Sequence, residues 1–164
     1  MIRPARPEPH PAAPTDRRAV LGAGAGLLVA GLATSPALAR TVVEPGRGTA
    51  LRRQILAALR PSVQRDLGAP IEFVVMQMRV AGDVCFTQVM CQRPGGRPID
   101  LARTPMAQRQ ELGLIDGTRT EAFLFRTGGR WQVEDYAVGS TDMWWSDPRF
   151  CPRYSTVLPG EMCS

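Results

Sequence analysis

The chain has 164 residues, with 20 basic side chains against 15 acidic ones and a formal net charge of +5. All the basic residues are arginine, and His10 is the only histidine. Without lysine, the chain cannot form a lysine Schiff base or bind phosphates through a P-loop lysine. If His10 is removed with a leader, Ser-His-Asp and Cys-His catalysis and histidine metal sites are excluded as well.

The first 39 residues have the pattern of an export signal. Arg17 and Arg18 precede a Gly/Ala-rich apolar run over residues 19–33, which is followed by Ala37-Leu38-Ala39. A positive region, a short apolar segment and a small-x-small site are typical of a cleavable signal peptide. The run of about 15 residues is shorter than the ~20 of a membrane-spanning helix. We predict cleavage after Ala39, with an uncleaved membrane anchor as the alternative.

The arginine pair also indicates the export route. Arg17-Arg18, one further residue, and then Val20 and Leu21 resemble a twin-arginine (Tat) signal. This resemblance implies that the twin-arginine export machinery and signal peptidase are partners. It also implies that the mature chain is periplasmic or secreted, without a membrane span.

The mature region, residues 40–164, is long enough for one domain. It carries 16 arginines against 13 acidic residues, a net charge of +3. The arginines are scattered, with one adjacent pair at Arg52-Arg53, whereas nucleic-acid-binding domains cluster basic side chains on one face or in a motif. We therefore expect no nucleic-acid partner.

One helix is predicted at the start of this domain. Thr49 is a suitable N-cap, and Gly68 is a natural C-terminal stop. Pro61 either kinks the helix or starts a second short one, because proline cannot donate to the preceding turn. The expected apolar face comprises Leu51, Ile55, Leu56, Leu59, Val63 and Leu67.

Two β-hairpins are predicted to follow. The second turns at Gly128-Gly129, which suits a type I′ turn because both central residues have positive φ. Residues 99–118 are not assigned, although 106–112 can form one or two helical turns, and the tail from Met143 is expected to be irregular. The predicted strands comprise residues 71–80, 84–92, 119–127 and 130–138.

Strict alternation along residues 71–80 places the even-numbered residues from Val74 to Val80 on one face, and Phe73 and Val75 on the other. The expected core also contains three methionines, which we interpret as packing residues rather than metal ligands. These methionines are Met76, Met78 and Met90.

Together these elements predict an α+β domain, in which the helix packs on a four-stranded antiparallel sheet of two hairpins. The element order resembles that of cystatin-like and NTF2-like proteins. Residues 78–83 (MRVAGD) and 129–139 (GRWQVEDYAVG) resemble segments of small exported bacterial proteins, a resemblance that implies no activity.

Four cysteines lie in the exported region, where an even number favours disulfides. Cys85 and Cys91 are predicted on one strand about 20 Å apart, too far to bond to each other. Either each strand cysteine pairs with Cys151 or Cys163, which staples the tail across the strand, or Cys151 and Cys163 pair locally. A zinc site is not expected, because the region has no C-x-x-C motif and no histidine.

Several acidic and aromatic residues are candidates for a site. Glu134 and Asp135 are expected on opposite faces of a strand, where they cannot act together. The tryptophan pair, Trp144 and Trp145, either stacks on a ligand or packs as a hydrophobic anchor beneath the tail. The further binding candidates are Asp142, which follows the last predicted strand, and Arg130, which flanks the Gly128-Gly129 turn. The carboxylates considered for hydrolysis are Glu121, Asp142 and Asp147.

We expect no catalytic residues, cofactor or metal in this domain. The favoured hypothesis is an exported, non-catalytic binding or accessory module for a protein, a peptide or a cell-envelope component. The alternative is a small-ligand-binding or carboxylate-based hydrolytic domain. A deep, polar-lined pocket that contains a carboxyl group with a raised pKa favours the alternative, whereas an exposed apolar patch around Trp144 and Trp145 favours the first hypothesis.

Overall fold

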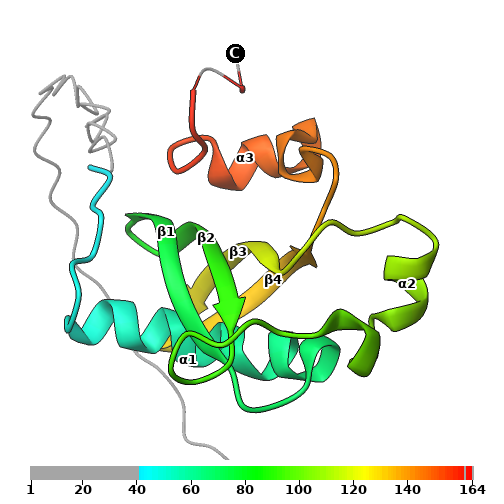
Figure 1. Cartoon of the computed structure of the whole chain (residues 1–164). Coiled ribbons are helices and arrows are strands. Elements are labelled where there is room, and N and C mark those ends of the chain that lie inside the picture. Colours follow the sequence, from blue (N-terminus) through cyan, green and yellow to red (C-terminus); the bar gives the residue numbers. More distant parts are fainter. Residues whose placement is uncertain (1–40, 161, 164) are drawn as a thin grey trace, which may run out of the picture. The chain divides into compact units, whose positions relative to one another are not determined.

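A computed structural model of the protein describes residues 41–160, 162 and 163. The predicted signal peptide, with Arg17, Arg18, Ala37 and Ala39, lies outside these residues and stays a prediction. The α+β fold is confirmed: one helix packs on a four-stranded antiparallel sheet (Figure 1).

Helix α1 (Ala50–Leu67) has the predicted ends. Thr49 Oγ1 accepts a hydrogen bond from the Arg52 amide at 3.4 Å, and the Gly68 amide donates to the Gln64 carbonyl at 2.9 Å. The helix runs unbroken through Pro61. Pro61 and Ala57 both lie on the exposed side, so water can satisfy the Ala57 carbonyl that proline leaves unpaired.

The sheet has the strand order β1-β2-β3-β4, so β1 and β4 are its edges. Each strand pairs antiparallel with its neighbour in the chain. The bounds of β2, β3 and β4 are as predicted, and β1 is shifted by one residue from its predicted range. The strands are β1 (Glu72–Ala81), β2 (Val84–Gln92), β3 (Arg119–Thr127) and β4 (Arg130–Val138).

Both faces of the sheet are covered, by different parts of the chain (Figure 1). Helix α1 packs on one face through Ile55, Leu59, Val63 and Leu67. The C-terminal segment covers part of the other face and is more ordered than predicted. It contains the 3₁₀ turns η2 (Trp144–Ser146) and η3 (Pro148–Phe150) and the short helix α3 (Cys151–Tyr154).

A β-bulge in β1 changes which residues face α1. Val75 pairs with Val89 and Gln77 with Gln88, which leaves Met76 as the extra residue. The prediction of strict alternation is therefore wrong, because Phe73 and Val75 face α1 before the bulge and Met78 and Val80 after it. Of the three methionines expected in the core, only Met78 is buried; Met76 is 58% exposed and Met90 38%.

A second bulge, in β4, brings two neighbouring carboxylates to the C-terminal segment. Phe123 pairs with Asp135 and Leu124 with Val133, so Glu134 has no partner on β3. Glu134 forms an ion pair with Arg153, and Asp135 forms one with Arg149 at 2.9 Å. The prediction that Glu134 and Asp135 point to opposite faces is wrong, because the extra residue interrupts the alternation.

Of the two predicted disulfide arrangements, the structure has the local one within the C-terminal segment. Cys151 and Cys163 form a disulfide with a Cα–Cα distance of 5.5 Å. Cys85 and Cys91 are free thiols, buried on the α1 side of the sheet, whereas the C-terminal segment packs on the opposite side. A disulfide that staples the tail across β2 is therefore excluded by the geometry.

Between the two hairpins the chain forms short helical turns. These are the 3₁₀ turn η1 (Leu101–Arg103) and helix α2 (Ala107–Glu111), and α2 falls inside the range where helical turns were predicted. Met106, directly before α2, is buried in the core on the α1 side. This contact ties α2 to the domain near the end of β4.

Candidate functional site

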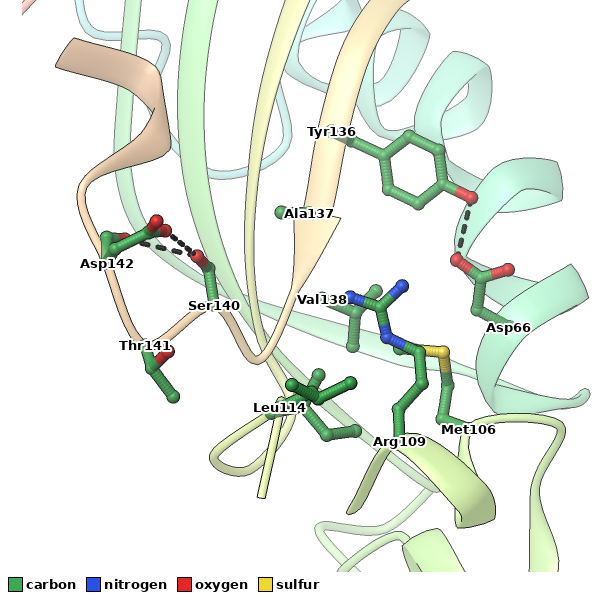
Figure 2. Close-up of a pocket in the computed structure, with 11 residues that line it drawn as sticks. Asp66, Met106, Arg109, Leu114, Tyr136, Ala137, Val138, Ser140, Thr141 and Asp142 are labelled. Carbon is green, nitrogen blue, oxygen red and sulfur yellow. Dashed lines mark hydrogen bonds between the residues drawn. The ribbon is translucent and has the colours of Figure 1, made fainter. Parts of the chain in front are cut away.

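A pocket of about 470 Å³ lies where the C-terminal end of α1, helix α2 and the end of β4 meet (Figure 2). Its lining combines charged, hydroxyl and apolar side chains, contributed by three parts of the chain that are far apart in sequence. The lining residues are Asp66, Met106, Arg109, Leu114, Ile115, Tyr136, Ala137, Val138, Ser140, Thr141 and Asp142.

One wall is fixed by a hydrogen-bonded network between β4 and α1. The Tyr136 hydroxyl donates to Asp66 Oδ2 at 2.7 Å and accepts from Arg65 Nη2 at 3.1 Å. Partial burial, followed by the bond to Asp66, raises the pKa of Tyr136 above its ordinary value near 10. The phenol therefore keeps its proton at neutral pH and acts as a donor rather than a base.

The opposite wall is the loop that follows β4. Ser140 Oγ donates to Asp142 Oδ1 at 2.7 Å. Gly139 holds this loop close to the segment before β3: its carbonyl accepts from the Asp116 amide at 2.7 Å, and its φ is +63°. A Cβ at this position would lie 2.6 Å from the Gly117 carbonyl oxygen, so only glycine fits the close approach.

Arg109 of α2 supplies the positive charge of the pocket. Its exposed side chain points from α2 into the pocket, toward the wall of Tyr136 and Asp66 (Figure 2). Within the described part of the chain, its guanidinium has neither a salt bridge nor a hydrogen bond. A ligand can therefore use all the donors of this group.

The structure brings only one predicted binding residue, Asp142, to this pocket. Trp145 is 7% exposed and its ring lies 5.3 Å from that of Phe86, while Trp144 packs edge-on against Phe123 at 5.7 Å. The exposed aromatic patch that would favour docking of a large partner is therefore not formed by these rings. Arg130 lies at the other end of β4, at the hairpin turn.

Residues 66, 109 and 136 were not among the predicted site residues. Asp66 falls within the predicted helix, Tyr136 within the predicted strand 130–138, and Arg109 within the unassigned residues 99–118. A charged side chain on a short helix gives no sequence signal of its own. Their meeting depends on the tertiary packing of α1, α2 and β4.

The two free thiols of the domain are buried. Burial raises the pKa of Cys91 to about 11, and raises the pKa of Cys85 still further. Both groups are therefore thiols rather than thiolates at neutral pH, and neither lines the pocket between α1, α2 and β4. Among residues 41–160, 162 and 163 there is also no cluster of three or more His, Cys, Asp or Glu side chains that could hold a metal ion.

A larger hollow of about 650 Å³ lies beside β2 and the segment before β3, and it shares Ser140 with the first pocket. Its lining includes the exposed Met76 and Met90 and the polar side chains of Gln92, Asp116 and Thr118. Its one cation, Arg119, already contacts the carboxylate of Glu121 and the Ser140 carbonyl. Among the described residues, this hollow therefore has no unpaired cation, unlike the pocket that contains Arg109.

Comparisons of the chain with family models, curated proteins and solved structures find no match. The resemblance in element order to cystatin-like and NTF2-like proteins therefore stays a prediction. No helix in the described residues has both the length and the apolar character needed to cross a membrane.

Proposed function

We propose that this protein is an exported, non-catalytic binding module, and that the pocket containing Arg109 holds a polar group of its ligand. The ligand is a peptide, a protein segment or a component of the cell envelope. The observation that carries this proposal is the Arg109 guanidinium, which has no partner among the described residues and faces a pocket in which hydrogen bonds position Tyr136, Asp66 and Asp142.

The chemistry of the pocket favours binding over catalysis. Tyr136 is held protonated, the free thiols are buried elsewhere, and the mature region has no imidazole or amine side chain. Preformed hydrogen bonds keep Asp66 and Asp142 in fixed positions. Fixed polar groups beside apolar wall residues are typical of sites that recognise a ligand.

Export belongs to the same proposal. We propose that the twin-arginine machinery carries the folded chain and that signal peptidase cleaves it after Ala39. The intact mass of protein isolated from the periplasm tests this directly. We expect a chain that begins at Arg40, with one disulfide and two thiols; a mass that retains the first 39 residues would contradict cleavage.

Binding can be tested by ligand-induced stabilisation. The mature domain is heated with either a tryptic digest of casein or chitotetraose, each at millimolar concentration. A ligand that binds the folded state raises Tm, and we expect the rise to disappear in the double variant Arg109→Gln/Asp142→Asn. An equal rise in the variant, or none in either protein, would contradict the proposal.

A hydrolytic function is the second candidate, because two carboxylates, Asp66 and Asp142, line the same pocket. Pairs of carboxyl groups across a cleft carry out glycoside hydrolysis in many enzymes. The same incubations can be followed by mass spectrometry for new fragments. Cleavage that is lost in both Asp66→Asn and Asp142→Asn would favour hydrolysis over simple binding.

A further inference from the structure

We propose that the ligand of this pocket is a short peptide with free termini, whose carboxylate pairs with Arg109 and whose ammonium group pairs with Asp142. This inference rests on the proposed function and deepens it by naming the ligand class. Three features of the pocket support it: the charges that remain available, their placement, and the strand edge that lies between them.

The available charges are those of Arg109 and Asp142. Asp66 accepts the Tyr136 hydroxyl and lies beside the guanidinium of Arg65, which offsets its charge. Asp142 accepts a hydrogen bond only from a neutral hydroxyl, that of Ser140, among the described residues. The pocket therefore presents one free cation and one free carboxylate, which complements a ligand with both signs of charge.

The two groups lie on opposite sides of the pocket (Figure 2). A free amino acid carries its ammonium and carboxylate on one carbon atom, so it spans less of the pocket than a peptide does. A peptide separates its terminal charges along an extended chain. A pocket of about 470 Å³ has room for only a few residues, which favours a short peptide.

The end of β4 supplies partners for the amide groups of such a peptide. Tyr136, Ala137 and Val138 all line the pocket, although neighbouring side chains of a strand alternate between faces. The pocket therefore runs along the edge of β4, and β4 is an edge strand of the sheet. Edge strands have backbone groups that can pair with an added peptide strand. The Tyr136 amide already donates to Asp135 Oδ1 at 2.9 Å, so the peptide would pair with the strand beyond this amide.

The apolar lining residues select the side chains of the peptide. Met106, Leu114, Ile115 and Val138 provide aliphatic and thioether surface between the charged groups. Leu114 is 53% exposed, whereas the other three are at most 9% exposed, so Leu114 supplies most of the apolar surface that is open to a ligand. Leucine side chains suit it, and leucyl-leucine is therefore the probe.

Calorimetry with four probes separates the contributions of the two termini. The probes are leucyl-leucine, its N-acetyl form, its C-terminal amide and free leucine. We expect leucyl-leucine to bind at least tenfold more tightly than each of the other three. In Arg109→Gln the amide binds as well as the free acid, and in Asp142→Asn the acetylated peptide binds as well as the free amine.

Matched controls change the same charges outside the pocket. Arg103→Gln and Glu111→Gln alter exposed residues near α2 that do not line it, and both should bind leucyl-leucine like the wild type. Equal affinity for free and blocked termini would overturn this inference. If leucyl-leucine does not bind but chitotetraose still stabilises the domain through Arg109 and Asp142, the peptide inference fails and the proposed function stands. If no probe binds, both the peptide inference and the proposed function fail.

Discussion

Arg119 Nε lies 2.6 Å from Oε1 of Glu121, a carboxylate that is 0% exposed. Neither oxygen of Glu121 accepts a well-aligned hydrogen bond from a described residue, so this contact is its main electrostatic compensation. Arg119 Nη2 also donates to the Ser140 carbonyl at 3.3 Å. The pair therefore connects the sheet to the loop that forms one wall of the ligand pocket.

Loss of Arg119 leaves a buried charge without compensation. We expect Arg119→Met to lower the free energy of unfolding by about 3 kcal/mol. The double variant Arg119→Met/Glu121→Leu should be more stable than the single one, because it removes the stranded carboxylate. Urea unfolding measures both, with Arg103→Met as the exposed control; a double variant less stable than Arg119→Met would contradict this account.

The domain should lose stability at alkaline pH. Burial raises the pKa of Cys91 from 9.0 to about 11, so the folded state holds this proton more tightly than the unfolded state. The raised pKa of Cys91 contributes roughly 2–3 kcal/mol to the free energy of unfolding. This contribution is complete below about pH 9 and is lost as pH rises toward 11. Cys85 extends the same trend to higher pH, because burial raises its pKa as well.

Denaturant unfolding at a series of pH values from 7 to 11 tests the role of the Cys91 thiol. The variant Cys91→Ala removes one titrating group and should show a shallower loss of stability above about pH 9, although its stability at pH 7 is also reduced. Parallel pH profiles for the wild type and Cys91→Ala would contradict the assignment.

Reduction should loosen the C-terminal segment without unfolding the sheet. The disulfide joins Cys151 and Cys163 across only 12 positions, and a loop of this size contributes about 3 kcal/mol. We expect Cys151→Ser/Cys163→Ser to retain the β-sheet circular dichroism signal. Complete unfolding by reductant alone would show instead that the core depends on this disulfide.

The Tyr154 hydroxyl should stabilise the packing of α3 on the sheet. Tyr154 is fully buried, and its hydroxyl donates to Glu134 Oε2 at 2.7 Å. Tyr154→Phe keeps the ring in the aromatic cluster and removes one hydrogen bond, with an expected loss of about 1 kcal/mol. Thermal unfolding measures the change, and Tyr136→Phe serves as the partly exposed comparison; an unchanged Tm in Tyr154→Phe would contradict this role.

The fold was predictable where local signals agreed. Thr49 and Gly68 define α1 through capping, and Gly128-Gly129 defines the second hairpin through its turn. The extra residues Met76 and Glu134 could not be foreseen, because a bulge depends on pairing between strands rather than on the sequence of one strand.

The site was less predictable than the fold. Asp142 was recognised as a polar residue after a strand, but its partners in the pocket come from α1 and α2. The choice between disulfide arrangements likewise depended on which face of the sheet holds Cys85 and Cys91. In both cases three-dimensional packing supplied information that residue spacing does not contain.

The most direct test of the binding account is to locate the ligand on the domain. Backbone amide spectra of the ¹⁵N-labelled mature protein can be recorded while a tryptic digest of casein is added. We expect the largest shifts at residues that line the pocket, among them Arg109, Val138 and Asp142. Shifts confined to the hollow around Met76 and Met90, or to the C-terminal segment, would contradict the account.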